Sequence, residues 1–303
     1  MSATGALAEF DPFAGSDAAA GGLRYLLLEV FSATPLQGNQ LAVFLDGRGL
    51  DSERMQSLAR ELKLSETVFM LPAEAGGDGR IRIFTPAAEL LFAGHPTLGS
   101  AAVLAGALGR ERVVLETGSG PVEVVFEELR RRTASGWMGQ PLPSWEEFEA
   151  PAELLAALGV EVSSLPIEVY CNGPRHVYVE LPSREAVAAL GPDLGAIGRL
   201  GEIGVSCFAG AGSRYKNRMF APGLGVPEDP ATGSAAGPLA VHLARHGRIA
   251  WGEEIEIEQG LEILRPSLLR ARALGSDERL ERVEVGGSAV IVASATFWPD
   301  PAA

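Results

Sequence analysis

Three ionisable side chains occupy positions that suit proton transfer: Glu66, His95 and Asp229. Glu66 lies in the largely apolar strand segment "LSETVF" (64–69). A carboxyl group in an apolar cleft has a raised pKa because burial disfavours its charged form, and a raised pKa suits acid–base catalysis near neutral pH. A solvent-facing position is the alternative for a strand glutamate. His95 and Asp229 each precede a proline, which places them at a turn or a helix start.

The histidine and the aspartate lie in two similar segments, "FAGHPTLGSAA" (92–102) and "VPEDPATGSAA" (226–236). Each contains a proline, two spacer residues and Gly-Ser-Ala-Ala. "RIFTP" (82–86) and "RMFAP" (218–222) precede them at nearly the same separation. Shared motifs in one order indicate an internal duplication. This alignment places the histidine of one copy opposite the aspartate of the other.

Each repeated segment predicts the start of a buried helix. The residues after Gly-Ser-Ala-Ala are apolar on nearly every face, which is typical of a helix enclosed by a sheet. Pro96 and Pro230 suit a first helical turn, and Asp229 is a good N-cap residue. Two such helix ends facing a shared cleft would bind a carboxylate substrate, or an enolate formed from one, through free backbone N–H groups. A capped helix start without a ligand is the alternative for either copy alone.

The surrounding sequence predicts short strands with few helices. We expect strands at residues 23–31, 39–45, 65–71, 80–86, 175–181, 254–260 and 282–298. Residues 51–64 show helical spacing after an Asp/Ser cap, and residues 183–190 predict another helix. Residues 128–150 lose periodicity, so we place the linker between two domains there.

Composition limits the function classes. The net charge of −14 argues against nucleic acid and anionic membranes as partners. No apolar run is long enough for a transmembrane helix, and the first 22 residues lack the features of a secretory signal, so we expect a disordered leader and a cytoplasmic protein. The two cysteines, Cys171 and Cys207, exclude a disulfide framework and a structural zinc site.

Three other sequence features do not indicate a functional site. His242 and His246 have helical i, i+4 spacing, but the sequence shows no third metal ligand, so we interpret them as an ordinary helix end. No phosphate-binding G-x-x-x-x-G-K-[ST] motif is present, which argues against a nucleotide. Ser100 and Ser234 lack the G-x-S-x-G frame of a nucleophilic serine.

The chain resembles the PhzF-like (phenazine biosynthesis) family over about residues 24–298. "AGHPTLG" (93–99) and "EDPATGSA" (228–235) carry the resemblance, together with "PLQGNQLAVFL", "ARELKLSETVFM" and "EQGLEILRPS". It implies an α+β, diaminopimelate epimerase-like fold. Two pseudo-symmetric domains would each contain a mixed, mostly antiparallel β-sheet rolled around a central helix, with the active site between them.

The resemblance also implies domain limits and an oligomer. After a leader at 1–22, we place an N-terminal domain at 23–130 and a C-terminal domain at 131–284. We expect the strands at 285–298 to return to the first domain, and the protein to form a homodimer.

The chemistry implied is isomerisation of a small carboxylate, typified by trans-2,3-dihydro-3-hydroxyanthranilate. A proton would move from one carbon to another, followed by enol-to-ketone conversion, with no metal or cofactor. The resemblance assigns catalysis to Glu66, His95 and Asp229, and substrate binding to Gly94, Gly233 and Ser234. Glu66 would take and return the proton.

Two other functions stay open: a binding protein that keeps the fold without catalysis, and a racemase or epimerase that uses carboxylates. Epimerases of this fold that use two thiols have cysteines where this chain has Ala93 and Thr232, so two-thiol chemistry is disfavoured. Gln40 and Leu264 replace a proline and a glycine that are common in the family, and either could reshape the substrate site.

Overall fold

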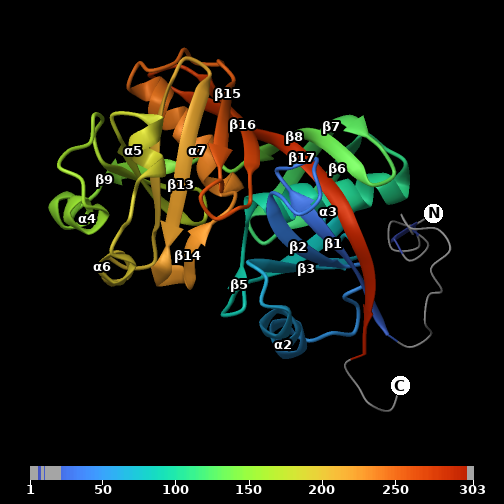
Figure 1. The fold of residues 1–303 in the computed structure, drawn as a ribbon. Helices are drawn as coiled ribbons and strands as arrows, with labels where there is room; N and C mark the ends of the chain where they lie inside the picture. Colours follow the sequence, from blue (N-terminus) through green and yellow to red (C-terminus); the bar gives the residue numbers. More distant parts are fainter. Residues whose placement is uncertain (1–5, 8–9, 11–21, 299–303) are drawn as a thin grey trace. The chain divides into compact units, whose positions relative to one another are not determined.

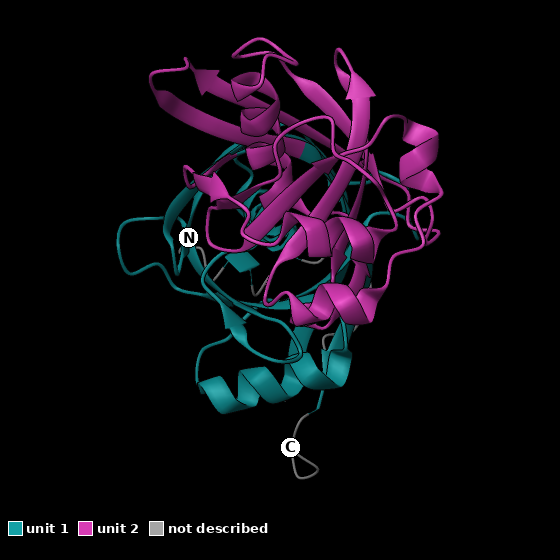
Figure 2. Ribbon diagram, turned by 90° about the vertical axis from the view of Figure 1, so that its left-hand side faces the viewer, with its two compact units in different colours: residues 1–138, 287–303 teal, residues 139–286 magenta. Residues whose placement is uncertain are grey.

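The computed structural model describes residues 6–7, 10 and 22–298, and the chain divides into two compact units. Unit 1 comprises residues 1–138 and 287–303, and unit 2 comprises residues 139–286 (Figure 2). The predicted leader at 1–22 therefore lies almost entirely outside the described residues. Among the described residues, no helix is long and apolar enough to cross a membrane.

Unit 1 consists of short strands around one long helix (Figure 1). Its strands are β1 (Leu23–Val30), β2 (Asn39–Phe44), β3 (Glu66–Leu71), β4 (Gly79–Phe84), β5 (Glu89–Leu90), β6 (Arg112–Thr117), β7 (Gly120–Leu129) and β8 (Thr133–Gln140), which extends two residues into unit 2. Its helices are α2 (Ser52–Leu62) and α3 (Gly94–Leu108). The final strand, β17 (Leu280–Phe297), begins in unit 2 and ends in unit 1.

The strands of unit 1 form a closed ring. The pairing order is β17–β1–β2–β3–β4–β6–β7–β8, and β8 pairs again with β17. The β2–β3 and β4–β6 pairs are parallel, whereas the β17–β1, β1–β2, β3–β4, β6–β7 and β7–β8 pairs are antiparallel. Helix α3 contacts β1, β2, β3, β4, β6 and β7 and is buried from Gly94 to Ala105, as expected for a helix with few polar residues.

Helix α2 covers the outside of this ring, where the expected amphipathic pattern is confirmed. Asp51 caps the helix by accepting a hydrogen bond from the Arg54 N–H, and Met55, Leu58 and Ala59 are buried. They pack against aromatic side chains of three neighbouring strands, Phe44, Phe69 and Phe84.

Unit 2 also consists of strands around one long helix, with three additional short helices (Figure 1). Its strands are β9 (Ser144–Glu147), β10 (Glu168–Cys171), β11 (Arg175–Glu180), β12 (Gly204–Ala211), β13 (Arg214–Ala221), β14 (Val226–Asp229), β15 (Ile255–Gln259) and β16 (Ser267–Gly275). Its helices are α4 (Pro151–Leu158), α5 (Arg184–Ala188), α6 (Leu194–Arg199), the 3-10 turn η1 (Pro222–Leu224) and α7 (Gly233–Arg245). Helix α7 is buried through Ala244, while α4, α5 and α6 cover an apolar cluster on β11 and β12.

The two units share one sequence of strand pairings. In unit 1, β1–β2, β2–β3, β3–β4 and β4–β6 are antiparallel, parallel, antiparallel and parallel. In unit 2, β10–β11, β11–β12, β12–β13 and β13–β15 follow the same order. The repeat seen in the sequence is therefore a repeat of topology.

The residue-by-residue alignment of the repeat is wrong by five positions at the helices. Ala93 is the N-cap of α3 and Thr232 is the N-cap of α7, so Gly94 corresponds to Gly233 and His95 to Ser234. Gly-Ser-Ala-Ala starts α7 but forms a later turn of α3. The sequence alignment matched the two identical tetrapeptides, whereas in the structure the equivalent positions are the starts of the two helices.

Asp229 is not an N-cap residue, contrary to the sequence-based expectation. It ends β14, where its extended backbone pairs with Met219 of β13, and Pro230 lies outside the helix. The linker predicted at 128–150 is also not irregular, because β8 and β9 lie within it and β8 pairs with β7. The boundary between the units falls after Met138. From Ala289 onward, β17 pairs with β1.

Candidate active site

In unit 1, Glu66, the first residue of β3, lies beside His95, the second residue of α3, and both side chains are largely buried. The Oε2 atom of Glu66 lies 3.3 Å from the Nε2 atom of His95, and the two side chains are only 16% and 5% exposed. The two atoms are within ion-pair reach but are not aligned as a direct hydrogen bond. Such contacts often tighten only when substrate binds.

His95 is neutral at physiological pH. Burial lowers its pKa to about 3, although a hydrogen bond to the backbone of Gln40 opposes part of that shift. Because Nε2 has no hydrogen-bond partner among the described residues, the bond to Gln40 uses Nδ1, and its pKa-raising effect identifies Nδ1 as the donor. The Nε2 lone pair therefore faces Glu66, so the two side chains can hold one proton between them.

Both long buried helices begin without a side-chain cap. Neither Ala93 nor Thr232, the N-caps of α3 and α7, makes a side-chain capping bond within the described part of the chain. The first N–H groups of each helix, at Gly94 and Gly233, therefore keep the partial positive charge that attracts anions. Substrate binding at these two glycines stays a prediction.

In unit 2, a buried glutamine holds the turn that carries Asp229. Gln259, which ends β15 and is 1% exposed, donates from Nε2 to the Asp229 carbonyl at 2.7 Å and to Thr232 Oγ1 at 3.0 Å. The Thr232 hydroxyl in turn donates to Asp229 Oδ2. Asn217 Nδ2 donates to Gln259 Oε1 at 3.0 Å, and this bond fixes the orientation of the amide. The Asp229 carboxylate is thus held by its own turn.

Replacing Gln259 with leucine is expected to lower both stability and activity. The change removes the acceptor of the buried Asn217 amide and the hydrogen bonds that Gln259 donates to the Asp229 carbonyl and the Thr232 hydroxyl, which costs about 2 kcal/mol of unfolding free energy. The loosened turn should lower kcat about tenfold. Gln56→Leu is the matched control, since Gln56 donates to the Thr85 carbonyl in unit 1 and touches no candidate site residue. Equal kcat in the two variants would refute a role for Gln259 in placing Asp229.

The start of α7 is held by side chains from neighbouring strands. His176 Nε2 lies 3.0 Å from Ser234 Oγ, and Asn172 Nδ2 donates to the Ser234 carbonyl at 2.9 Å. Gln140 Nε2 donates to the Gly233 carbonyl at 2.8 Å. The candidate residues Gly233 and Ser234 therefore occupy a fixed turn rather than a mobile loop.

Comparison with known proteins identifies the family. The family model described as "Phenazine biosynthesis-like protein" matches residues 28–295. The chain is 53% identical to a trans-2,3-dihydro-3-hydroxyanthranilate isomerase of Pseudomonas aeruginosa, covering 88% of this chain and 95% of that protein. It is 50% identical to the enzyme of the same name from Pseudomonas fluorescens, covering 90% and 98%. The chain belongs to the phenazine biosynthesis-like family.

Solved structures give the same result at the level of the fold. A structure from Pseudomonas aeruginosa, described as that of a predicted epimerase, superposes with a TM-score of 0.77 at 32% identity, covering 92% of this chain and 100% of that one. The resemblance inferred from the sequence motifs is confirmed.

The structure of this family member sorts the six sequence-predicted site residues into two groups. Glu66, His95 and Gly94 lie together in unit 1. Asp229, Gly233 and Ser234 lie within six residues of one another in unit 2.

Sequence reasoning missed the supporting residues. Gln259, Asn172 and Gln140 were not singled out, and His176 lies in the expected strand at 175–181 without having been assigned a role. Gln259 had one signal, because it stands in the "EQG" motif that carried part of the resemblance.

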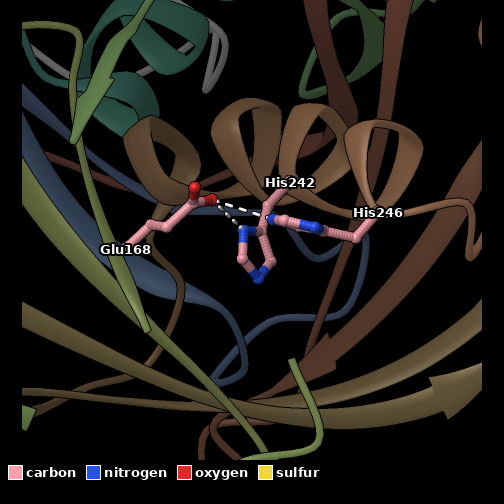
Figure 3. Close-up of side chains that lie close together, drawn as sticks. All are labelled: Glu168, His242 and His246. Carbon is pink, nitrogen blue, oxygen red and sulfur yellow. Dashed lines mark hydrogen bonds and ion pairs between the residues drawn. The ribbon is translucent and has the colours of Figure 1, made fainter. Parts of the chain in front are cut away.

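The histidines near the end of α7 do have a third potential metal ligand, contrary to the sequence-based expectation. Glu168 Oε2 lies 3.1 Å from His242 Nδ1 and 3.0 Å from His246 Nε2, and Figure 3 shows both rings turned toward this carboxylate. Glu168 starts β10, more than 70 residues earlier in the chain. The spacing of the two histidines alone gives no sign of it.

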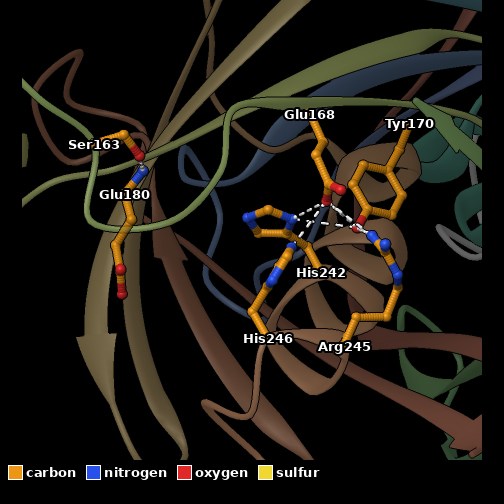
Figure 4. Close-up of polar contacts among 7 residues, drawn as sticks. All are labelled: Ser163, Glu168, Tyr170, Glu180, His242, Arg245 and His246. Atoms are coloured by element: carbon orange, nitrogen blue, oxygen red, sulfur yellow. Dashed lines mark hydrogen bonds and ion pairs between the residues drawn. The ribbon is translucent and has the colours of Figure 1, made fainter. Parts of the chain in front are cut away.

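Arg245 already provides a positive charge to the same oxygen. Its Nη1 atom lies 2.8 Å from Glu168 Oε2 and also donates to the Tyr170 hydroxyl, as Figure 4 shows. Burial alone would raise the pKa of Glu168, but hydrogen bonds from His242, His246 and Arg245 outweigh burial and hold that pKa well below its usual range. The cluster is therefore a charge-balanced network of hydrogen bonds at the C-terminal end of α7, away from Ser234.

Proposed function

We propose that this chain is a trans-2,3-dihydro-3-hydroxyanthranilate isomerase that moves a proton between two substrate carbons by acid–base catalysis. The isomerase assignment rests on identities of 50–53% over most of the chain to isomerases of that name. The Glu66–His95 pair is the observation that carries the mechanism, because it places a carboxyl group beside a neutral imidazole at an uncapped helix start.

Glu66 takes the proton from the substrate and returns it at another carbon. In the interval, the proton on Oε2 faces the Nε2 lone pair of His95, which can accept it in a hydrogen bond. The hydrogen bond from Nδ1–H to the Gln40 backbone helps to orient the His95 ring. The protonated carboxyl group therefore stays beside the substrate, and because Glu66 is 16% exposed its proton can exchange with solvent before it is returned to carbon. Enol-to-ketone conversion of the product completes the reaction.

The remaining candidate residues bind the substrate's polar groups. We propose that the N–H groups of Gly94 and Gly233, each at an uncapped helix start, bind a carboxylate and stabilise negative charge that develops during proton removal. Asp229 and Ser234 supply an acceptor and a hydroxyl group for the amino, hydroxyl or carboxylate groups of the substrate. None of these roles requires a metal or an organic cofactor.

The fold type, the oligomeric state and the location are proposed from the resemblance to the family. We propose a diaminopimelate epimerase-like fold in both units, a homodimer and a cytoplasmic location. The identical order of strand pairings in the two units supports the first of these.

Racemase or epimerase activity that uses carboxylates is the weaker candidate, and two-thiol chemistry of that kind is disfavoured. The helix starts carry Ala93 and Thr232, whereas Cys207 is buried in β12, where burial raises the pKa of its thiol well above the usual range. A thiol held in its neutral form is a poor base.

The proposal is tested by measuring whether the purified chain turns over the proposed substrate. The purified chain is expected to convert trans-2,3-dihydro-3-hydroxyanthranilate into an isomer of equal mass, which chromatography and NMR distinguish from the substrate. An unchanged substrate in the presence of correctly folded protein would contradict the proposal and favour a binding protein. Inversion at a stereocentre without movement of a double bond would instead indicate an epimerase.

A further inference from the structure

A second histidine lies beside the proposed substrate-binding serine. His176 of β11 is 3% exposed, and its Nε2 atom lies 3.0 Å from Ser234 Oγ. The imidazole ring packs against Gly204, which is the partner of His176 in the parallel β11–β12 pair. A Cβ atom at Gly204 would lie only 2.8 Å from His176 Nδ1. The strand next to the histidine thus accommodates the ring only because it has a glycine there.

The contact is not that of an activated serine nucleophile. In a nucleophilic Ser–His pair, the second ring nitrogen donates to a third group that orients the imidazole as a base. His176 Nδ1 is buried and has no hydrogen-bond partner among the described residues. The third group is missing, so His176 is not set up to remove the serine proton.

The same observation determines which way the hydrogen bond runs. Burial lowers the pKa of His176 to about 4, so the ring is neutral near pH 7 and carries one N–H. If Ser234 donated to Nε2, that N–H would be on Nδ1, buried without an acceptor; orphaned buried N–H groups are rare in proteins. If Nε2–H donates to Ser234 Oγ, the N–H has an acceptor, and only the lone pair on Nδ1 stays without a hydrogen bond.

We propose that His176 is a positioning residue: its Nε2–H donates to Ser234 Oγ and leaves the serine proton free to donate to the substrate. A serine hydroxyl has one proton and two lone pairs, so occupying one lone pair restricts the directions in which its proton can point. The inference rests on the proposed function, in which Ser234 binds the substrate.

A second side chain, that of Asn172, holds the backbone of Ser234. Pro238 lies inside α7, four residues after Ser234, and has no N–H to donate to the Ser234 carbonyl. Asn172 replaces that missing bond, because its Nδ2 donates to this carbonyl at 2.9 Å. Two side chains, one on the carbonyl and one on the hydroxyl, therefore fix Ser234 in place.

The first test reads the tautomer and does not depend on activity. In the full-length protein labelled with ¹⁵N-histidine, NMR correlations between ring nitrogens and carbon-bound protons identify the protonated nitrogen of each of the four histidines. The His176 signals are assigned by their loss in His176→Gln. We expect the Nε2–H tautomer at pH 7. The Nδ1–H tautomer would overturn the proposal, whether or not the chain turns over its proposed substrate.

The second test is a double-mutant cycle on the isomerase reaction. His176→Leu should raise KM about fivefold, as expected for one lost hydrogen bond, with little change in kcat. Ser234→Ala should raise KM at least as much, and the double variant should match Ser234→Ala alone. His176→Gln, which can place an amide N–H near the position of Nε2, should restore most of the loss. Additive effects of the two changes would overturn the proposal, because they would mean that His176 acts independently of Ser234.

Discussion

Glu66→Gln is expected to lower kcat for isomerisation about a thousandfold, which is within the range attributed to a single general acid–base group. The amide keeps the shape of the side chain and its place at the start of β3, but it cannot accept and return a proton at physiological pH. KM should change little, because Glu66 is not needed to bind the substrate carboxylate. Steady-state kinetics of the purified variant measures both constants.

Two controls separate chemistry from folding. Glu61→Gln removes an exposed carboxylate from α2, five residues earlier, and should keep full activity. Glu66→Asp keeps the carboxyl group but withdraws it from His95, so an intermediate kcat is expected. If Glu66→Gln retained a tenth or more of the wild-type kcat with a native circular dichroism spectrum, another group would have to carry the proton.

The second large effect concerns stability. We expect His95 and His176 together to lower the free energy of unfolding by about 4 kcal/mol between pH 7 and pH 5, because they have folded-state pKa values of about 3 and about 4 against 6.5 in the unfolded chain. Below pH 6.5 the unfolded chain takes up protons that the folded protein excludes, so stability falls as pH falls. Above pH 7 these two side chains contribute almost nothing to the pH dependence.

Urea unfolding at pH 8, 7 and 5 measures this dependence. Wild-type protein should be similarly stable at pH 8 and 7 and clearly weaker at pH 5. His95→Gln and His176→Gln should each remove about half of the loss between pH 7 and 5, whatever their effect on absolute stability. Equal stability at pH 5 and pH 7 would show that the two imidazoles are not buried in their neutral form.

The sequence predicts well what depends on local pattern. Helix α2 follows from an aspartate cap and apolar residues at helical spacing, and β1 to β4 follow from short apolar runs between turn residues. The repeat was detectable because Phe-x-Pro and the small residues recur in order. Glu66 stood out as an ionisable group in an apolar strand and His95 as the histidine of a repeated segment, and the structure places them in contact.

What the sequence could not supply was contact between distant residues and the position of helix ends. Gln259 reaches the Asp229 turn across 30 residues, and His176 reaches Ser234 across 58. Such pairs depend on strand register, which a single sequence does not show. The helix starts were misaligned because Gly-Ser-Ala-Ala fits the first turn of one helix and a later turn of the other. The residue that caps a helix is decided by backbone pairing, as Asp229 in β14 shows.

The deuterium content of the product, after a reaction in D₂O with wild-type protein and with Glu66→Gln, tests the central claim most directly. The claim is that Glu66 carries the proton between two substrate carbons. Wild-type protein should give product with deuterium at the newly protonated carbon, located by NMR, while folded Glu66→Gln should give neither product nor exchange. Deuterium incorporation at an undiminished rate in the variant would contradict the claim.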